Sequence, residues 1–508
     1  MKRNVLEYLE ETAKAYPMKT AAIDENGTAT YKELLDASKR IGSALCGKIK
    51  SGQPVAVLAE KSIATLSTFF GIIYAGGFYT LLNPELPRHR HEQIQSVLQA
   101  EYIVTDSEHR ELVSGLVPES NVLDIAELLN CDINENALSL SRQNAVDTDP
   151  LYANFTSGST GVPKGVLVGH RSVIDFIDQF TEIFGINETD IIGNQAPFDF
   201  DVSVKDIYSA IKVGATLVII PRALFSSPAS LLDFICDKNV TNLTWAVSAL
   251  CLVSTFHGLD YRVPTTVKRV MFSGEEMPLK HLNTWMTHLP DTEFVNLYGP
   301  TEITCNCTYH RISRDMDYSG GIPIGYPFPN ERVFLLDASD KLVTDPDTVG
   351  EICVSGSALA LGYYNNPEQT AKAFCQNPLN SSYPERIYRT GDLGKYLDNR
   401  ELIFCGRKDF QIKHMGHRIE LEEIERVISE VDGVERLCAV YDKERSKLYG
   451  FYMGEIDKKE LREKLRQYLP IFMIPNTFYK IESFPITKNG KVDRKALLEM
   501  KENRNGIK

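Results

Sequence analysis

The stretch FTSGSTGVPKG, Phe155–Gly165, is the strongest local signal in the sequence, and it directly follows the apolar lead-in LYAN. A loop of glycines, hydroxyl side chains and one lysine can wrap its N–H and O–H groups around phosphate oxygens, while Lys164 neutralises their charge. The Walker pattern GxxxxGK[ST] is absent, because Lys164 lies between Pro163 and Gly165. A surface turn is the alternative. The density of glycine and hydroxyl groups favours a phosphate-binding loop of another kind.

On both sides of this loop, apolar stretches alternate with helical patterns. The first segment, Asn4–Leu45, is typical of a helix, a short strand and a second helix. The alternation of predicted helices and strands continues to about Gly406. This alternation favours an α/β fold whose strands are buried on both faces. We expect a large N-terminal domain of layered helices and sheets. Its clearest predicted strands are Val55–Ala59, Tyr102–Thr105, Thr216–Ile220, Arg269–Phe272 and Glu331–Leu336.

Beyond Gly406 the pattern changes to that of a smaller α+β domain. Residues 420–431 (ELEEIERVISEV) and 458–469 (KKELREKLRQYL) are charged amphipathic helices by their spacing, and residues 437–442 and 448–454 are short strands. We therefore predict an N-terminal domain, 1–406, and a small C-terminal domain, 407–508, on a hinge. No low-complexity linker separates them, so the joint is expected near Gly406–Phe410.

Composition excludes several classes of function. The 508 residues carry a net charge of −13, which argues against nonspecific binding to nucleic acid or to an anionic membrane. The N-terminus has acids early and no apolar signal region, and no apolar run is long enough to span a bilayer, so we expect a cytoplasmic protein. The ten cysteines include no CxxC pair, which leaves no zinc or redox signature.

Four further motifs follow the loop along the chain: NLYGPTEITCNCT (Asn296–Thr308), YRTGDLGKY (Tyr388–Tyr396), GRKDFQIKHMGHRIELEEIE (Gly406–Glu425) and PITKNGKVDRKAL (Pro485–Leu497). Together with TSGSTGxPKG, they resemble the adenylate-forming (AMP-binding) superfamily, specifically its amino-acid adenylation branch, over nearly the whole chain. The resemblance implies a ligase that uses ATP and Mg²⁺ to convert an amino acid to aminoacyl-AMP with release of pyrophosphate. It then passes the acyl group to the phosphopantetheine thiol of a carrier protein.

The resemblance also assigns roles to residues. Asn296 and Tyr298 would contact the adenine, Asp392 the ribose hydroxyls and Glu302 the Mg²⁺, which suits an amide, an aromatic ring and two carboxylates. Lys491 would be the catalytic lysine, which offsets the repulsion between the substrate carboxylate and the α-phosphate. Asp409 would be the hinge. The remaining nucleotide-binding positions are Thr156, Ser157, Gly158, Ser159, Thr160, Gly161, Lys164, Gly274, Glu275, Thr301 and Arg407, and Thr156 is counted with Lys491 and Glu302 as catalytic.

The amino-acid pocket is expected to begin at FDFDVSV, where the family has FDxSV at the start of a helix. Asp201 stands where amino-acid-activating members hold the substrate ammonium, whereas relatives that activate fatty or aromatic acids lack this aspartate. Helix N-capping is the alternative role for Asp201, and the two roles are compatible. By alignment, the rest of the pocket is Phe200, Val202, Lys205, Thr244, Met271, Ser273, Leu297, Cys305 and Asn306, with Lys491 at the carboxylate.

Two of these residues bear on the substrate. Leu297 stands where many members have a smaller residue, which favours a short substrate side chain. Lys205 follows Asp201 by four residues and needs a partner if it is buried. It can pair with an acidic substrate, pair with Asp201, or extend to water. The chain also resembles D-alanyl carrier protein ligases, although these commonly have an apolar residue in place of Lys205. D-alanine or another small amino acid is therefore our first expectation, and an acidic amino acid the alternative.

Two other functions compete with this one. An acyl-CoA synthetase is the nearest enzymatic rival, and Asp201 argues against it because a fatty acid has no ammonium to pair. A nucleotide-binding scaffold without catalysis is a more remote interpretation, since every expected chemical residue is present. No Asp-Ser-Leu carrier motif follows Lys491. We therefore expect the phosphopantetheine carrier to be a separate protein.

Overall fold

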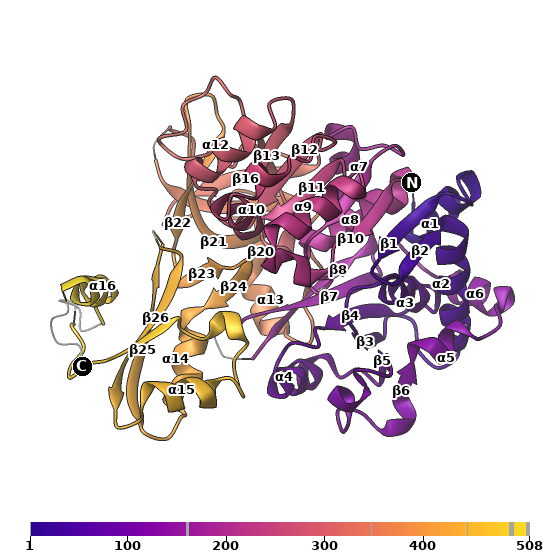
Figure 1. Cartoon of the computed structure of the whole chain (residues 1–508), viewed down its shortest axis with the longest axis horizontal. Coiled ribbons are helices and arrows are strands. Elements are labelled where there is room, and N and C mark those ends of the chain that lie inside the picture. Colours follow the sequence, from indigo (N-terminus) through magenta and orange to yellow (C-terminus); the bar gives the residue numbers. More distant parts are fainter. Residues whose placement is uncertain (1, 159–161, 347, 444, 487–491, 504–508) are drawn as a thin grey trace. The chain divides into compact units, whose positions relative to one another are not determined.

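The structure is a computed structural model that describes residues 2–158, 162–346, 348–443, 445–486 and 492–503 (Figure 1). The contacts within the chain divide it into two units. The first contains residues 1–84, 98–154 and 165–408, and the second contains residues 85–97, 155–164 and 409–508.

A nine-stranded sheet forms the centre of the first unit. In spatial order its strands are β15 (Tyr326–Pro327), β14 (Thr308–Arg311), β13 (Glu293–Tyr298), β12 (Arg269–Ser273), β11 (Asn242–Ala246), β9 (Ile191–Asn194), β10 (Thr216–Ile219), β1 (Thr20–Asp24) and β2 (Gly27–Thr30). The strands from β13 to β1 are parallel, and the edge strands are antiparallel. Parallel strands require crossover connections, which explains the alternation of strand and helix in the sequence.

A seven-stranded sheet is the second layer of this unit. In spatial order its strands are β19 (Gly362–Tyr363), β8 (Lys164–Gly169), β7 (Pro150–Thr156), β4 (Phe78–Leu82), β3 (Pro54–Leu58), β5 (Tyr102–Thr105) and β6 (Val122–Asp124). Every residue of β3 and β4 is buried. Their continuous apolar runs are therefore those of parallel strands covered on both faces.

The helices pack against these sheets in two apolar cores. The main apolar core contains α1 (Leu6–Ala15), α2 (Tyr31–Leu45), α3 (Ile63–Tyr74), α7 (His170–Ile183) and α8 (Val202–Val213). A second core packs α9 (Pro228–Asp237), α10 (Val247–Thr255), α11 (Gly258–Tyr261) and α12 (Leu279–His288) against the nine-stranded sheet. The shorter helices α5 (Ile125–Leu129) and α6 (Glu135–Arg142) lie beside α2.

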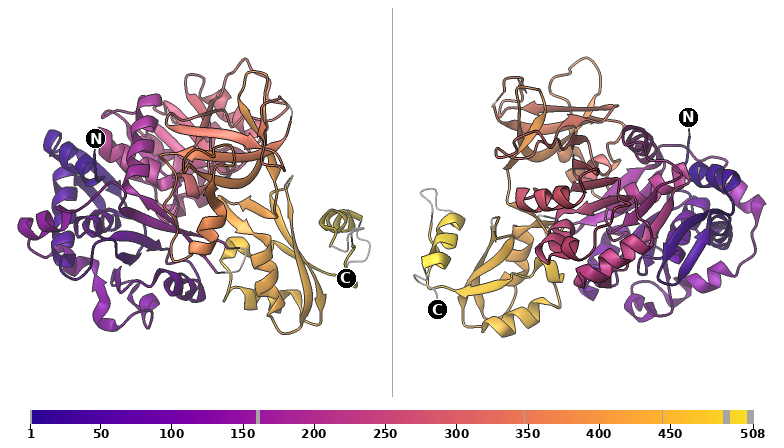
Figure 2. Two further views of the ribbon diagram at one scale, coloured as in Figure 1. Left: turned by 180° about the vertical axis from the view of Figure 1, so that it is seen from behind. Right: turned by 45° about the horizontal axis from the view of Figure 1, so that its top comes forward.

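The last part of the first unit is an antiparallel six-stranded sheet, drawn in salmon and orange in Figure 2. It contains β17 (Leu342–Val343), β16 (Glu331–Leu336), β18 (Gly350–Gly356), β21 (Arg386–Tyr396), β20 (Phe374–Gln376) and β22 (Leu402–Arg407), with α13 (Pro367–Ala373) alongside. The sequence pattern predicted its strand Glu331–Leu336 but not a separate antiparallel sheet. Short alternating strands joined by turns carry a weaker signal than buried parallel ones.

The second unit has an α+β core of its own. A hairpin of β23 (Gln411–His414) and β24 (His417–Glu420) leads into α14 (Leu421–Ser429). The three-stranded sheet consists of β25 (Val434–Asp442), β26 (Lys447–Gly454) and β27 (Thr477–Lys480). The remaining helices are α4 (Arg88–Leu98), α15 (Lys458–Leu465) and α16 (Arg494–Asn503).

The predicted fold class is confirmed: a large N-terminal part of layered helices and sheets precedes a smaller α+β part. The predicted strands agree with β3, β5, β10, β12 and β16 to within a residue at each end. Among the described residues, no helix is long and apolar enough to cross a membrane.

Candidate active site

The predicted pocket residues on strands lie in the middle (Thr244, Met271) and near the carboxyl end (Ser273, Leu297) of neighbouring parallel strands. Thr244 of β11 is paired in register with Met271 of β12, and Ser273 of β12 with Leu297 of β13. Because side chains alternate along a strand, these four residues share one face of the sheet. Open α/β sheets bind ligands beyond this edge, where the loops that follow the strands supply polar groups.

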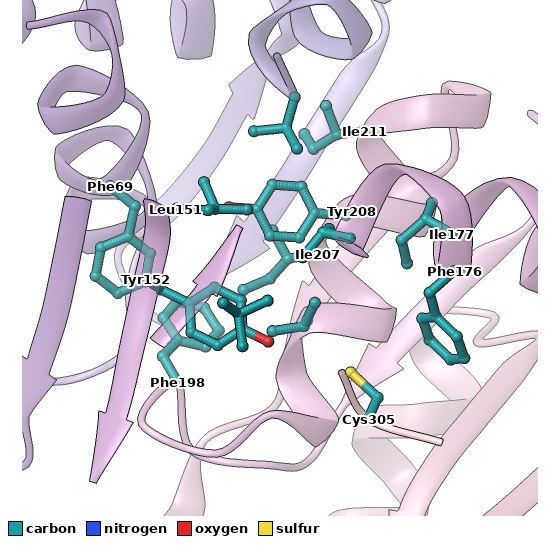
Figure 3. Close-up of a cluster of buried hydrophobic side chains, with 14 of the residues drawn as sticks. Phe69, Leu151, Tyr152, Phe176, Ile177, Phe198, Ile207, Tyr208, Ile211 and Cys305 are labelled. Carbon is teal, nitrogen blue, oxygen red and sulfur yellow. The ribbon is translucent and has the colours of Figure 1, made fainter. Parts of the chain in front are cut away.

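Helix α8 is held rigidly in the core next to this edge. It ends at Gly214, whose φ of +78° is the left-handed conformation that glycine adopts without strain. Its apolar side chains belong to the main core, and Figure 3 shows Ile207, Tyr208 and Ile211 in one cluster with Leu151, Tyr152, Phe176 and Ile177. A pocket built on this helix is therefore fixed by packing rather than by a mobile loop.

Asp201 is half-buried at the residue that precedes α8. It has helical backbone angles, and its side chain makes no capping hydrogen bond. The structure therefore does not use Asp201 as a helix cap, which was the alternative role predicted from the sequence. Phe200 and Val202, its neighbours, are also partly buried.

Lys205 is buried within the same helix, with only 1% of its surface exposed. Its Nζ donates a hydrogen bond to Oδ1 of Asn306 at 2.6 Å. Burial lowers the pKa of Lys205, and the nearby carboxylates of Asp201 and Asp206 act against that shift. The interpretation in which this lysine extends to water is wrong, because helix α8 faces the core at this position.

The loop after β13 approaches α8 from the other side. The Cys305 thiol donates to the backbone oxygen of Asp201 at 3.1 Å. Thr304 and Cys305 have φ values of +51° and +75°, a conformation that is costly for residues with a Cβ. Hydrogen bonds hold this strained pair in place, because Thr304 also donates to the oxygen of Ala358 at 2.7 Å. The loop thus binds α8 at two points, through Cys305 and through Asn306.

A second set of hydrogen-bonded polar side chains, Lys61, Asn194 and Asp206, was not predicted from the sequence. Asn194, at the end of β9, donates from its amide nitrogen to Asp206 at 2.9 Å. Lys61 donates to Oδ1 of Asn194 at 3.2 Å and to the backbone oxygen of Gln195 at 3.0 Å. Burial raises the pKa of Asp206 to about 7 and lowers that of Lys61 to about 8. The only sequence signal was the adjacent pair Lys205 and Asp206 within a largely apolar helix.

The predicted nucleotide residues Tyr298, Asp392 and Arg407 come together in the first unit. The Tyr298 hydroxyl donates to one oxygen of Asp392 at 2.6 Å, and Arg407 pairs with the other. Asp392 and Arg407 lie on adjacent strands, β21 and β22, where they are partners in register. Asn296 has its amide nitrogen on the backbone oxygen of Pro323 at 2.8 Å.

Glu302 lies in a 3₁₀ turn, Thr301–Ile303, directly after β13, and only 1% of its surface is exposed. Its carboxylate accepts a hydrogen bond from the Tyr363 hydroxyl at 2.7 Å. Mg²⁺ is commonly held by one or two carboxylates together with phosphates and water. One fixed carboxylate fits that use, and among the described residues no group of three or more potential ligands forms a metal site. Gly274 and Glu275 follow β12 at the same edge, and an added Cβ at Gly274 would meet nothing within 4 Å.

The comparisons with known proteins agree with this arrangement. Residues 9–364 match the model of the family described as AMP-binding enzyme. The chain belongs to the AMP-binding enzyme family. As a member it is an enzyme, an adenylate-forming ligase, and enzymes of this family use ATP. The predicted resemblance is thereby confirmed.

Two relatives from the family illustrate how the chain compares in length. Zwittermicin A synthase ZmaJ of Bacillus cereus is 34% identical, with 96% of this chain and 93% of that protein covered. Bacitracin synthase 1 of Bacillus licheniformis is 34% identical over 97% of this chain, but the match covers only 9% of that protein. The chain therefore spans about a tenth of the length of this second relative.

Solved structures of other proteins share the fold over almost the whole chain. IdnL1 has a TM-score of 0.83 and 27% identity, with 96% of this chain and 98% of that one covered. The Vibrio cholerae adenylation domain AlmE, in complex with glycyl-adenosine-5′-phosphate, has a TM-score of 0.85 over 99% of this chain and 98% of that one. Its identity is 24%, so this likeness concerns the fold alone.

The second unit contains the described part of the family's phosphate loop. Ser157 donates from its hydroxyl to the backbone oxygen of Arg418 at 2.7 Å. Gly158 has no room for a side chain, since an added Cβ would lie 2.1 Å from the backbone oxygen of Val162. Thr156 and Lys164 stand at the two ends of the loop. The predicted residues Ser159, Thr160, Gly161 and Lys491 lie outside the described residues.

Asp409 begins the long C-terminal segment of the second unit. One oxygen of its carboxylate accepts a hydrogen bond from the backbone N–H of Gln411 at 3.2 Å. This bond closes a tight turn just before the hairpin β23–β24. The backbone therefore has a defined conformation on the C-terminal side of the predicted hinge.

Proposed function

We propose that this enzyme activates a small amino acid, D-alanine or a similar one, to aminoacyl-AMP with release of pyrophosphate. It then transfers the acyl group to the phosphopantetheine thiol of a separate carrier protein. The observation that carries the proposal is the position of Asp201. Asp201 directly precedes the rigid helix α8 and is half-buried, and its backbone oxygen accepts a hydrogen bond from the Cys305 thiol. A carboxylate at this place offers an ion pair to a substrate ammonium, which a fatty or aryl acid lacks.

The residues of the first unit are suited to bind the nucleotide. Asp392 offers two carboxylate oxygens to the vicinal hydroxyls of ribose, and Arg407 and Tyr298 hold it in one orientation. Asn296 can present its amide oxygen to the adenine, because its nitrogen is already bonded to Pro323. We assign Glu302 to Mg²⁺, which would neutralise the charge of the ATP phosphates when bound.

The chemistry needs no nucleophile from the protein. The substrate carboxylate attacks the α-phosphorus, the bond to pyrophosphate breaks, and the electron pair leaves with pyrophosphate. Catalysis then depends on positioning and on electrostatic stabilisation of the transition state. We propose that Lys491 offsets the repulsion between the substrate carboxylate and the α-phosphate. The phosphate loop, with Thr156, Ser157 and Lys164, would bind the phosphate oxygens.

We further propose that the domains are 1–406 and 407–508, and that the smaller one turns on Asp409 after the adenylate forms. Such a turn would remove Lys491 and admit the carrier thiol. A two-domain ligase needs a step of this kind because the two half-reactions use different attacking groups at one site. We place the enzyme in the cytoplasm, where ATP is supplied.

Several observations support a short substrate side chain. Thr244, Met271, Leu297 and Lys205 are each at most 2% exposed, so the expected pocket wall consists of closely packed residues. A substrate with a large side chain would require these packed residues to move, which protein interiors resist. An acidic amino acid, selected by Lys205, is the alternative within the same reaction.

The experiment is amino-acid-dependent ATP–pyrophosphate exchange. Both enantiomers of the common amino acids are compared with fatty and aryl acids. The proposal predicts strongest exchange with D-alanine or another small amino acid. Strongest exchange with glutamate or aspartate would support the acidic alternative. Exchange only with acids that lack an amine, together with a free CoA product, would identify an acyl-CoA synthetase and contradict the proposal.

A further inference from the structure

Three buried polar side chains of the first unit are joined by hydrogen bonds on and beside strand β14. Nδ1 of His310 lies 2.6 Å from a carboxylate oxygen of Glu401, and Nε2 lies 3.0 Å from the Tyr318 hydroxyl oxygen. His310 and Glu401 are 5% exposed, and Tyr318 is 7% exposed. Polar groups this deep are retained only where each has a specific partner. None of the three belongs to the motifs that predicted the site.

The hydrogen bonds of this set have one direction. The backbone N–H of Ser313 can only donate, and it donates to the Tyr318 hydroxyl oxygen at 2.8 Å. The hydroxyl proton of Tyr318 then goes to Nε2 of His310, and the proton on Nδ1 goes to Glu401. With this tautomer every donor of the set has an acceptor. The second oxygen of Glu401 accepts from the amide nitrogen of Asn399 at 2.8 Å, which fixes the far end.

These bonds fix one end of the segment 318–324. The other end is paired with the start of β22, where the N–H of Ile324 donates to the backbone oxygen of Leu402 at 2.8 Å. Pro323 lies between the two fixed points, Tyr318 and Ile324. The position of the Pro323 carbonyl therefore depends on the hydroxyl of Tyr318 at one end and on β22 at the other.

The carbonyl of Pro323 sets the orientation of Asn296, the residue that we assign to the adenine. The amide nitrogen of Asn296 donates to this carbonyl at 2.8 Å. A side-chain amide has its donor and its acceptor on different atoms, so this bond decides that the oxygen is the atom offered to the base. Asn296 and His310 are also partners in register on β13 and β14. The buried set thus supports Asn296 through the neighbouring strand and through the loop of Pro323.

The orientation of this amide decides which purine it can bind. Adenine carries an amino group at C6, which is a donor, whereas guanine and hypoxanthine carry an oxygen there, which is an acceptor. An amide held with its oxygen toward the base matches the amino group and opposes the oxygen. An amide that is free to rotate could present either atom and would bind both kinds of base.

We propose that His310, Tyr318 and Glu401 are positioning residues that hold Asn296 with its oxygen toward the base, and that they thereby make the enzyme select adenine over a 6-oxopurine. This inference rests on the proposed function and defines the nucleotide specificity of the same site. The three residues act through the Pro323 carbonyl rather than by contact with the nucleotide.

The test measures kcat/KM for pyrophosphate exchange with ATP and with ITP, whose base is hypoxanthine, at a saturating concentration of the best amino acid. The full-length wild type is compared with Tyr318→Phe, Asn296→Ala and the double variant. The wild type should prefer ATP. Tyr318→Phe removes only the hydroxyl that joins the loop to His310, and the ratio of ATP to ITP should fall by about tenfold. In the Asn296→Ala background the same change should alter the ratio by less than about twofold.

Two further variants separate positioning from a general loss of stability. His310→Gln can keep a bond to Tyr318 but loses the bond to Glu401, so the ratio should fall in the same direction by a smaller factor. This variant also tests the inference if Tyr318→Phe does not fold. Tyr74→Phe is the matched control. Tyr74 is 1% exposed and its hydroxyl donates to Glu10 at 2.8 Å, and the loss of this hydroxyl should leave the ratio unchanged.

The outcomes are distinct. A wild type that uses ATP and ITP equally well would overturn the inference and leave amino-acid activation intact. So would a folded Tyr318→Phe enzyme with the wild-type ratio, or a ratio that falls equally with and without Asn296. If Tyr318→Phe does not fold, an unchanged ratio in His310→Gln has the same meaning. If the wild type supports no exchange with ATP and any amino acid, the proposed function itself fails, and the inference fails with it.

Discussion

At the scale of single residues, the candidate site is made of groups whose partners fix their orientation. Asp392 is held between Tyr298 and Arg407, Glu302 is held by Tyr363, and Lys205 by Asn306. The motifs predicted which residue types belong to the site. They carry no information on these partners, because each hydrogen bond joins residues far apart in the sequence. The hydrogen bonds that link Lys61, Asn194 and Asp206 were not predicted, for the same reason.

Replacing Asp392 with Asn should weaken ATP binding more than amino-acid binding. The change removes the charge that pairs with Arg407 and one acceptor proposed for the ribose. A hydrogen bond to a charged group contributes about 1.5–3 kcal/mol, so the KM for ATP should rise by about tenfold or more. Pyrophosphate exchange at varied ATP measures the effect, with exposed Asp398→Asn as the control. An unchanged KM for ATP in a folded variant would contradict the assignment.

The buried carboxyl group of Glu331 should make the stability of the protein depend on pH. Burial raises its pKa from the usual 4.5 to about 8, even though one oxygen accepts the N–H of Ala358 at 2.8 Å. Between these two values the folded chain holds a proton that the unfolded chain releases, so the free energy of unfolding falls as pH rises. Glu331→Gln cannot titrate but keeps the acceptor. Its Tm relative to wild type should therefore increase from about pH 5 to about pH 8. A constant difference in Tm would contradict the shift.

At the scale of secondary-structure elements, the agreement with the sequence depends on the strength of the periodic signal. Strands such as β3 and β10, buried on both faces, appear in the sequence as continuous apolar runs, and α8 begins where FDVSV predicted. The antiparallel sheet from β16 to β22 was not predicted as a unit. The segment between β18 and β20 contains β19 and α13, and the pairing between the strands of this sheet depends on tertiary packing.

The loop between β13 and β14 should tolerate no side chain at Gly299. An added Cβ would lie 2.5 Å from the Cα of Asn306 and 2.8 Å from the backbone oxygen of Cys305. Gly299→Ala should therefore cost about 1–3 kcal/mol and lower the exchange activity, because the loop that contacts α8 must shift. Gly320→Ala is the matched control, since nothing lies within 4 Å of its added Cβ. Equal unfolding midpoints for the two variants would refute this account of the loop.

At the scale of the whole molecule, the α/β layering and the small α+β part follow from the alternation of patterns and its change after Gly406. No sequence signal indicates that residues 85–97 and 155–164 group with the C-terminal segment. This grouping depends on contacts between distant segments, of which the buried ion pair of Arg90 with Glu423 at 2.8 Å is the clearest. Single-sequence patterns cannot reveal such a pair, because each residue alone is typical of a solvated helix face.

The pair of Arg90 and Glu423 should contribute strongly to the stability of the second unit. The two side chains are 9% and 3% exposed, so Glu423→Gln leaves a buried guanidinium without its counter-charge. Removing one partner of such a pair costs about 3–5 kcal/mol. Glu92→Gln on the same helix removes the partner of Arg88 in an exposed pair and should cost about 0–1 kcal/mol. Denaturant unfolding of the two variants compares these costs, and similar midpoints would contradict the role of the buried pair.

The most direct test of the central claim, that an amino acid is recognised through its ammonium, is pyrophosphate exchange by wild type and Asp201→Ala. The best amino acid is compared with the same acid lacking its amine. The account predicts that the wild type exchanges with the amino acid alone, and that Asp201→Ala loses about a hundredfold in kcat/KM, because an ion pair to the substrate is lost. Equal exchange by the two enzymes, or exchange by the wild type with the deaminated acid, would contradict it.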